Sequence, residues 1–432
     1  MPIVPRMALV TDVDAVVPTE ASKRSILLSA TLLALAAAGI VLLLCVVLLP
    51  WAEHVASWVI PSDAWVPLRP ARYVSDGAMF RLYEVSDGRT GYPYTPALPV
   101  VLAWVPGIGD HFHLLGDLIF TQGRPHMFLI LGPALGFIGT LPLLYVTGRA
   151  VQPASRTRTL AIQLLVFVAA SWASISYLHP EDTIACACLI AACIAAGRDN
   201  WRAAGALLAV GLLFKQWAAW PAIPIVVAAP RHKRSIVAFY AFGIPALVMA
   251  PFLLSTVETW RSLTGALTSL HLGHPQLWLK PLFGGRRYGN TTVLRVLWGA
   301  TSVAIAIRVR RCAETIACAD TLLAAVGTVM LLRLLFEPVM FGYYLVPPVV
   351  IAIVWSARNG YPVVMRAIAG FWLGAFSIPH AYPEAVFWLV LTVGLAYICG
   401  PMIRSLVRPQ GDGAANGDRL NPGDPILATA HR

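Results

Sequence analysis

A polar, acid-bearing stretch follows the first long apolar segment of the chain. Residues 51–95 come after the apolar run 26–50 and carry carboxylates among many aromatic side chains, including Asp63, Asp76, Glu84, Asp87, Trp58, Trp65, Tyr73, Tyr83, Tyr92 and Tyr94. A positioned carboxylate can take a proton from an acceptor hydroxyl, and aromatic rings can face sugar rings. Channels seldom need so many carboxylates and aromatics in one loop. The stretch therefore indicates a sugar-transfer site, with Asp63 or Asp76 as the catalytic base.

Each of these carboxylates also has a structural interpretation. Asp63 follows a Pro-Ser pair and could cap a helix. Asp76 and Asp87 each precede a glycine, which is a turn signal. Among the aspartates of this stretch we favour Asp63 as the base because it comes soonest after the first apolar run. It is therefore the best anchored at the membrane border, where the head group of a lipid donor lies.

Four further polar stretches separate later apolar runs, and in a single bundle they would meet residues 51–95 at one end. They are 179–182 (His-Pro-Glu-Asp), 215–217 (Lys-Gln-Trp), 256–290 and 333–344. Cationic groups there could stabilise a leaving phosphate. The candidate residues for binding the donor phosphate are Lys215, Arg286, Arg287 and Arg333. The candidate residues for binding the substrates are His179, Glu181, Asp182, Gln216, Trp65, Tyr94, His274, Tyr343 and Tyr344.

These candidates have structural alternatives as well. Glu181 and Asp182 follow a proline and could be first-turn acids favoured by the helix dipole, although two adjacent carboxylates at a membrane border are costly without a partner. Lys215 could extend to the surface or bind a phosphate. Arg333 and Glu337 have the spacing of an i,i+4 ion pair. No metal site is predicted, and the seven Cys, which lack metal-ligand spacing, are interpreted as core residues.

The composition predicts a polytopic membrane protein. The 432 residues are 58% hydrophobic and 12% charged, with a mean hydropathy of +0.71, whereas soluble domains carry roughly 25% charged residues. Because a span needs about 20 apolar residues, we expect about 12 spans, some of them short, near 25–50, 126–148, 159–178, 182–197, 203–214, 217–230, 235–255, 291–308, 318–335, 340–356, 361–379 and 385–404. The pair 203–214 and 217–230 could be a broken helix pair around a membrane-embedded site.

The basic residues predict an orientation. With the N-terminus inside, 20 of the 32 Lys and Arg fall on inner segments, and they recur at nearly every inner turn. The polar stretches then face outside. Residues 1–24 form a cytoplasmic segment, 25–404 the transmembrane domain, and 405–432 a disordered cytoplasmic tail. The net charge of +11 suits an anionic inner leaflet rather than nucleic-acid binding.

Three short motifs carry a resemblance to a known family. They are Ser62-Asp63-Ala64 with Leu82-Tyr83 and the aromatic-proline run 92–96, the stretch 211–215 (Gly-Leu-Leu-Phe-Lys) with Pro221 and Pro224, and the stretch 342–347 (Gly-Tyr-Tyr-Leu-Val-Pro). On these residues, residues 25–404 resemble the GT-C superfamily of glycosyltransferases, most of all the actinobacterial phosphatidylinositol mannoside mannosyltransferases and arabinofuranosyltransferases. Thr95 stands where the family usually has a second proline, and the His-Pro-Glu-Asp element is not part of the family pattern.

The resemblance implies an all-α bundle in the plasma membrane whose extracytoplasmic loops form the active site. It implies inverting transfer of mannose, or alternatively arabinofuranose, from a polyprenyl-phosphate donor to a cell-envelope glycolipid or polysaccharide. An Asp acts as the base. No cofactor is required, and a divalent metal is optional because polyprenyl phosphate is already a fair leaving group. The rival class is a transporter or flippase of lipid-linked sugars, which predicts internal repeats and broken helices at the midplane; no clear repeat is present.

Overall fold

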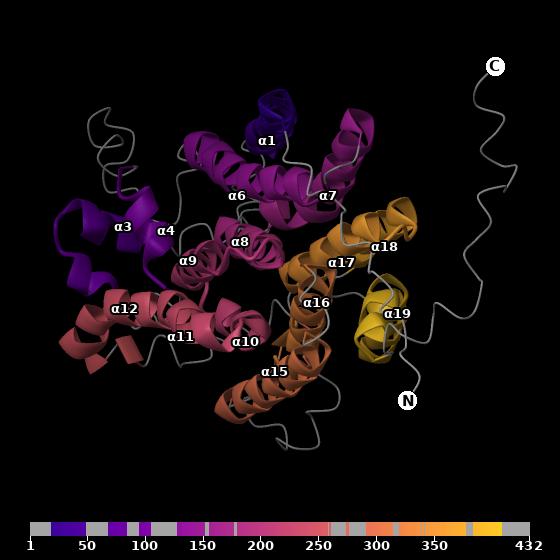
Figure 1. The fold of residues 1–432 in the computed structure, drawn as a ribbon. Coiled ribbons are helices and arrows are strands. Elements are labelled where there is room, and N and C mark those ends of the chain that lie inside the picture. The colour runs from indigo at the N-terminus through magenta and orange to yellow at the C-terminus, as the bar shows by residue number, and fades with distance from the viewer. Residues whose placement is uncertain are drawn as a thin grey trace, which may run out of the picture.

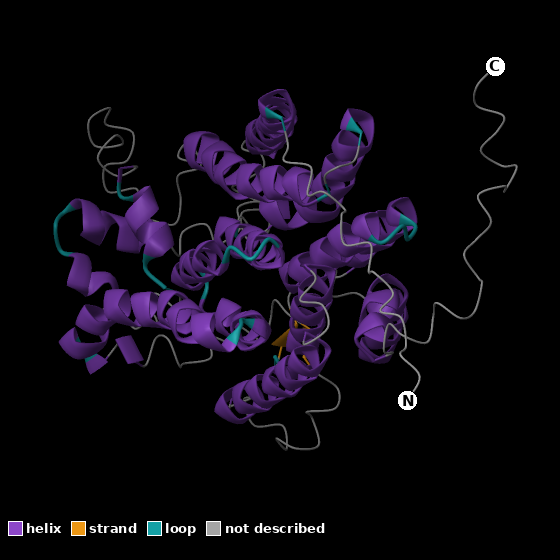
Figure 2. Ribbon diagram, in the orientation of Figure 1, coloured by secondary structure: helices purple, strands orange, loops and turns teal. Residues whose placement is uncertain are grey.

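Helices form almost the whole of the described chain. The computed structural model describes residues 19–48, 68–83, 95–104, 128–151, 155–176, 179–257, 259–260, 274–275, 291–313, 319–337, 339–340, 342–376 and 383–407. Within these residues the β structure is one antiparallel pair of two-residue strands, β1 (His274–Pro275) and β2 (Val339–Met340) (Figure 2).

The longer helices match the apolar runs of the sequence. They are α1 (Glu20–Leu48), α6 (Phe128–Ala150), α7 (Arg156–Ser176), α8 (Pro180–Gly197), α9 (Trp201–Phe214), α10 (Ala219–Ala228), α11 (Arg231–Ala238), α12 (Ile244–Ser255), α15 (Thr291–Ala313), α16 (Ala319–Phe336), α17 (Val346–Arg358), α18 (Val363–Phe376) and α19 (Glu384–Val407). A π-helical segment, η7 (Phe239–Gly243), joins α11 to α12. Shorter helices are α3 (Leu68–Ser75), η3 (Met79–Tyr83), α4 (Ala97–Leu102), η6 (Gln216–Ala218) and η9 (Gly342–Leu345).

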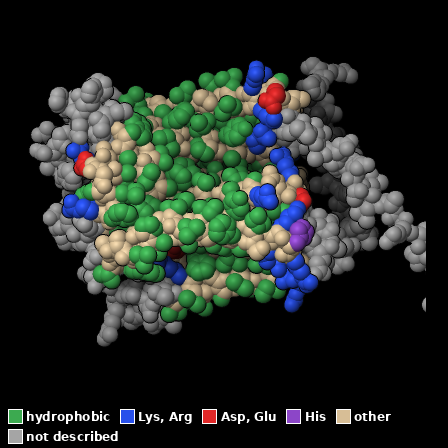
Figure 3. All heavy atoms as spheres, turned by 60° about the vertical axis from the view of Figure 1, so that its left-hand side comes forward, with side chains coloured by type: hydrophobic (Ala, Val, Ile, Leu, Met, Phe, Trp, Pro, Cys, Tyr) green, Lys and Arg blue, Asp and Glu red, His purple; other side chains and the backbone are tan. Residues whose placement is uncertain are grey.

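The face of the molecule drawn in Figure 3 is apolar across its middle. Figure 3 shows hydrophobic side chains covering a broad band, with charged side chains gathered toward its two edges. Within the described residues, 5 helical stretches are long and apolar enough to cross a membrane. The prediction of an all-α membrane protein is confirmed at this level. That about 12 helices cross, and that they adopt the GT-C arrangement, stay predictions.

Helix α8 lies at the centre of the bundle and is buried along almost its whole length (Figure 1). It packs against α6, α9 and α16. Its many Ala and Cys side chains are small, which lets neighbouring helices approach closely. A Cβ at Gly139 of α6 would lie 2.9 Å from Cα of Pro180, so a glycine is needed where α6 meets the start of α8. The thiols of Cys186, Cys188 and Cys193 are buried and free, as predicted for core residues.

The predicted break between residues 203–214 and 217–230 is present. Helix α9 ends at Phe214, Lys215 is extended with φ −149° and ψ 118°, and η6 leads into α10. Asn200 caps the other end of α9, because its side-chain oxygen accepts a hydrogen bond from the backbone N–H of Ala203 at 3.2 Å. The break matters because it places a lysine between two apolar helices, with its side chain inside the bundle.

The basic connectors meet at one end of the bundle, which we call the basic end. Arg358, the last residue of α17, pairs with Asp320 at the start of α16 and donates to the carbonyl of Ala150 at the end of α6. Lys233 of α11 pairs with Asp199, which follows α8, at 2.6 Å. Turns far apart in the sequence therefore share one end, as the alternating basic pattern predicts. Which side of the membrane this end faces stays a prediction.

A labelling experiment tests the orientation. The Ser86→Cys variant is expected to react with a membrane-impermeant thiol reagent in intact cells, because residues 51–95 are predicted to lie outside. The Ser235→Cys variant, at an exposed position of the basic end, should react only after lysis. The wild-type protein, which lacks the added cysteine, gives the background labelling from the native thiols. The reverse pattern would invert the topology and remove the argument for a lipid-carried donor.

Candidate functional site

Five ionisable side chains lie buried at the end of the bundle opposite the basic end. His179, Glu181, Asp182, Lys215 and Arg333, which we call the buried charge cluster, are each only 2–3% exposed. They come from the start of α8, the break after α9 and the last turn of α16. At 1.5 Å per residue, α8 extends about 27 Å from this cluster to the basic end. That length is close to the roughly 30 Å thickness of a hydrocarbon core.

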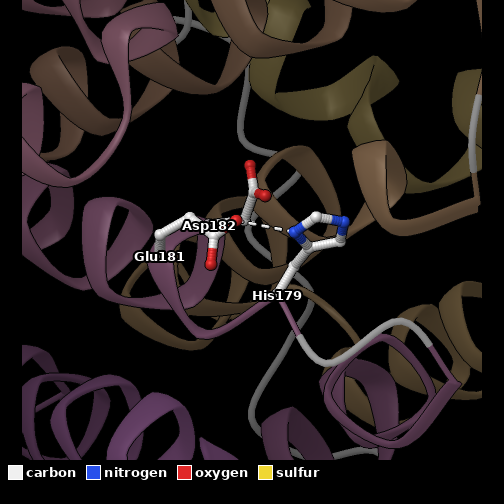
Figure 4. Close-up of side chains that lie close together, drawn as sticks. All are labelled: His179, Glu181 and Asp182. Carbon is white, nitrogen blue, oxygen red and sulfur yellow. Dashed lines mark hydrogen bonds and ion pairs between the residues drawn. The ribbon is translucent and has the colours of Figure 1, made fainter. Parts of the chain in front are cut away.

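The start of α8 places the two carboxylates side by side. Pro180 occupies the first helical position, where its missing N–H is not needed. Glu181 and Asp182 then fall in the first turn, where the helix dipole favours negative charge. The sequence-based prediction of first-turn acids is confirmed. Nδ1 of His179 lies 2.6 Å from Oε1 of Glu181 (Figure 4), so this carboxylate orients the imidazole.

Lys215 joins the two carboxylates. Its Nζ lies 2.9 Å from Oε1 of Glu181 and 3.0 Å from Oδ2 of Asp182. The indole N–H of Trp217 donates to Oδ1 of Asp182 at 2.6 Å. Two carboxylates from α8 therefore supply the counter-ion of Lys215 within the protein, so this ammonium does not need a phosphate to balance it. The alternative that Lys215 extends to the surface is wrong, since its side chain is buried.

Arg333 completes the cluster, and one of its hydrogen-bond donors has no partner in the described part of the chain. Its Nε lies 3.4 Å from Oε1 of Glu337, so the predicted i,i+4 pair is present. The guanidinium centre lies 5.1 Å from the ring of Trp217 and 3.9 Å from that of Tyr344, which is cation–π geometry. Nη1 is 3.8 Å from Oδ1 of Asp182, too long for a hydrogen bond. This buried atom has no hydrogen-bond partner among the described residues.

Aromatic side chains from η9 line the same place. The ring of Tyr343 lies 4.3 Å from that of His179 and 4.7 Å from that of Tyr344. Tyr343 is 5% exposed, so it belongs to the interior rather than to an interfacial belt. Strand β1 pairs His274 with Met340 of β2, just before η9. The pairing brings part of the predicted polar stretch 256–290 to this end of the bundle.

A cation could be held by His179, Glu181 and Asp182, whose ligand atoms lie within 4.8 Å of one another. Nitrogen and carboxylate oxygen donors suit several divalent metals. The ammonium of Lys215, however, already lies against both carboxylates. A metal ion at these ligands would therefore have to displace the ammonium of Lys215. The absence of a metal requirement stays a prediction.

The described part of residues 51–95 packs beside the bundle instead of joining the cluster. Asp76 is exposed and pairs with Arg72 at 3.0 Å, next to the turn at Gly77, whose φ is +72°. The turn interpretation of Asp76 is thus confirmed. Tyr83 is fully buried and meets the ring of Phe252 edge-on at 5.7 Å. The Leu-Tyr motif therefore holds this segment against α12.

The structure brings together most of the predicted site residues that it describes. Gln216 follows Lys215 in η6, at the edge of the cluster. The remaining candidates lie outside the described residues or have undescribed side chains: Asp63, Trp65, Tyr94, Arg286, Arg287 and His274. The sequence did not single out Trp217 as the hydrogen-bond donor to Asp182. Its place two residues after the buried lysine is the signal that could have found it.

Comparisons with known proteins add no assignment. No family model, curated protein or solved structure matches this chain. The functional argument therefore depends on the geometry of the buried charge cluster and on the sequence motifs around it.

Proposed function

We propose that the protein is a membrane glycosyltransferase that moves a sugar, mannose foremost, from a polyprenyl-phosphate donor to a cell-envelope glycolipid or polysaccharide. The observation that carries this proposal is the buried Arg333 guanidinium, whose Nη1 has no hydrogen-bond partner among the described residues. The planar guanidinium fork matches phosphate oxygens in geometry and charge. A lipid phosphate at the membrane border is a partner that such a group can bind.

In the proposed reaction the acceptor hydroxyl oxygen attacks the anomeric carbon of the donor sugar. The bond from that carbon to the phosphate oxygen breaks, and polyprenyl phosphate leaves with the electron pair. Arg333 stabilises the charge that develops on the phosphate. Asp63 takes the proton from the acceptor hydroxyl. Lys215, fixed by Glu181 and Asp182, holds the break after α9 in place and so positions the neighbouring Gln216.

Glu337 has a defined part in this proposal. Its carboxylate lies beside Arg333 at the long distance of 3.4 Å, and its side chain is 18% exposed. A weak, partly hydrated ion pair can exchange its carboxylate for a phosphate at little cost. Glu337 therefore holds the guanidinium in the absence of donor, and the donor phosphate takes its place.

The break at Lys215 favours a second candidate, a transporter or flippase of lipid-linked sugars. Transporters bind substrate near the bilayer midplane, between discontinuous helices, and α9 and α10 are interrupted in this way. The depth of the cluster favours the enzyme. It lies at the first turn of α8, about 27 Å from the basic end, and so near the level of lipid head groups.

A transfer assay separates the two candidates. The purified full chain is incubated in proteoliposomes with radiolabelled polyprenyl-phosphate mannose, or with the arabinose donor, and with an envelope glycolipid extract. Label in a product that survives mild acid, which cleaves the donor, supports glycosyl transfer. Label that crosses the bilayer while it remains on the intact donor would establish a flippase and refute the transferase.

Replacing Arg333 tests the phosphate contact. Arg333→Lys keeps the charge but loses the fork and the stacking on Trp217 and Tyr344. Hydrogen bonds to charged groups contribute about 1.5–3 kcal/mol, so the donor KM should rise about 10- to 100-fold. The matched control is Arg366→Lys, because Arg366 is also buried and stacked, on Tyr361 and Tyr397.

The control variant changes a buried arginine at the basic end, far from the buried charge cluster. Its donor KM should therefore stay at the wild-type value. The Glu337→Gln variant should lower the donor KM, because it removes the carboxylate that competes with the phosphate. If Arg333→Lys, Arg366→Lys and Glu337→Gln all have the same donor KM, Arg333 is a packing residue and its proposed contact with the donor phosphate is refuted.

A further inference from the structure

A second polar feature lies at the basic end, about one helix length from the buried charge cluster. A hollow of about 400 Å³ opens between the turn after α8, the start of α11 and the last turns of α15. Its walls include three arginines, one tryptophan, one proline and one aspartate: Arg231, Arg234, Arg310, Trp201, Pro230 and Asp199. Figure 3 shows Lys and Arg side chains gathered along this edge of the apolar band.

The positive charge of the hollow is not balanced by the described protein. Its one carboxylate, Asp199, is held by Nζ of Lys233 and by the indole N–H of Trp201, both at 2.6 Å. None of the three arginines forms an ion pair with a carboxylate among the described residues. Three guanidinium groups around one space repel each other unless an anion lies between them.

Arg234 shows that this is more than a basic surface. Its Nη2 donates to the carbonyl of Ala229 at 3.0 Å, which fixes the side chain in the wall. Its Nε is buried and has no hydrogen-bond partner among the described residues. A buried donor without a partner loses its hydrogen bonds to water and gains none in the protein, which costs free energy. By contrast, Arg311 on α15 is exposed and absent from the lining, as expected of an ordinary charge at a membrane border.

We propose that this hollow binds the phosphate group of an anionic ligand at the basic end of the protein. Arginine binds phosphate oxygens through two parallel N–H groups, and three arginines surround the space. The helices that carry them continue as exposed apolar surface, with Phe239 54% and Ile307 47% exposed one to two turns further along. Acyl chains would lie against such surface, so a phospholipid head group is the source that fits best.

Thermal unfolding of the purified full chain in neutral detergent tests the site. The probes are phosphatidylglycerol, phosphatidylcholine, inorganic phosphate and glycerol phosphate. A ligand that binds the folded state raises the unfolding temperature as its concentration rises. Phosphatidylglycerol should stabilise the wild type more than phosphatidylcholine. Arg234→Gln and Arg310→Gln should each weaken its apparent affinity about tenfold or more, whereas the matched variant Arg311→Gln should leave it unchanged.

Each result either identifies the kind of phosphate that binds or overturns the proposed site. If inorganic phosphate or glycerol phosphate stabilises as well as phosphatidylglycerol, with the same dependence on Arg234 and Arg310, the site takes a soluble phosphate. Equal stabilisation by both lipids, or equal loss in Arg311→Gln, overturns the site. If Arg234→Gln does not fold, Arg310→Gln on the other wall gives the answer. The proposal is independent of glycosyl transfer, because the readout is binding.

Discussion

Replacing Lys215 by methionine is expected to destabilise the protein by about 3–5 kcal/mol, the typical effect of removing one partner from a buried ion pair. Methionine keeps much of the volume but leaves Glu181 and Asp182 facing each other in the interior without the ammonium that now lies 2.9 and 3.0 Å away. The measurement is the fraction of protein that remains monodisperse after heating in mild detergent. Loss of activity in such a variant does not by itself report a phosphate contact.

Two further variants show whether the buried charge is the cause. Neutralising the partners as well, in Lys215→Met with Glu181→Gln and Asp182→Asn, should recover most of the stability, because a neutral replacement of a buried pair is often tolerated. The matched control is Lys233→Met. Lys233 is also ion-paired, but its side chain is 30% exposed and that of Asp199 is 70% exposed, so little change is expected. Comparable losses at both lysines would refute the argument.

Replacing Asp63 by asparagine is expected to lower the rate of sugar transfer about 10²–10⁴-fold, the usual contribution of a general base. Asparagine keeps the size of the side chain and can still form hydrogen bonds, but it cannot accept the proton. Asp76→Asn is the matched control in the same stretch. Because Asp76 lies exposed against Arg72, that variant should transfer sugar at nearly the wild-type rate.

The comparison between these carboxylates assigns the base. Turnover is measured on purified variants beside a melting curve, so that loss of fold is not taken for loss of chemistry. Full activity in Asp63→Asn with loss in Asp76→Asn would move the base to Asp76. Loss confined to Glu181 or Asp182 variants that keep their fold would move the base to the buried charge cluster.

Features that depend on a short stretch of chain were predictable. The length and apolar character of each run predicted its helix, because burial in lipid or protein favours a helix that satisfies its own backbone. Pro180 marked the start of α8 and hence the first-turn acids Glu181 and Asp182. The polar triplet at Lys215 marked the break after α9. The spacing of Arg333 and Glu337 predicted their ion pair.

Which polar groups meet could not be predicted in the same way. Lys215 pairs with Glu181, 34 residues earlier, and the indole N–H of Trp217 donates to Asp182 across 35 residues. These contacts depend on how far α8 and α9 are rotated about their axes and how closely they pack, which many side chains set together. The sequence alone determined that this is a helical, apolar protein with polar groups at the ends of its helices. Only the tertiary structure decided that Lys215 is neutralised while Nη1 of Arg333 has no hydrogen-bond partner among the described residues, because pairing distant charges requires the packed bundle.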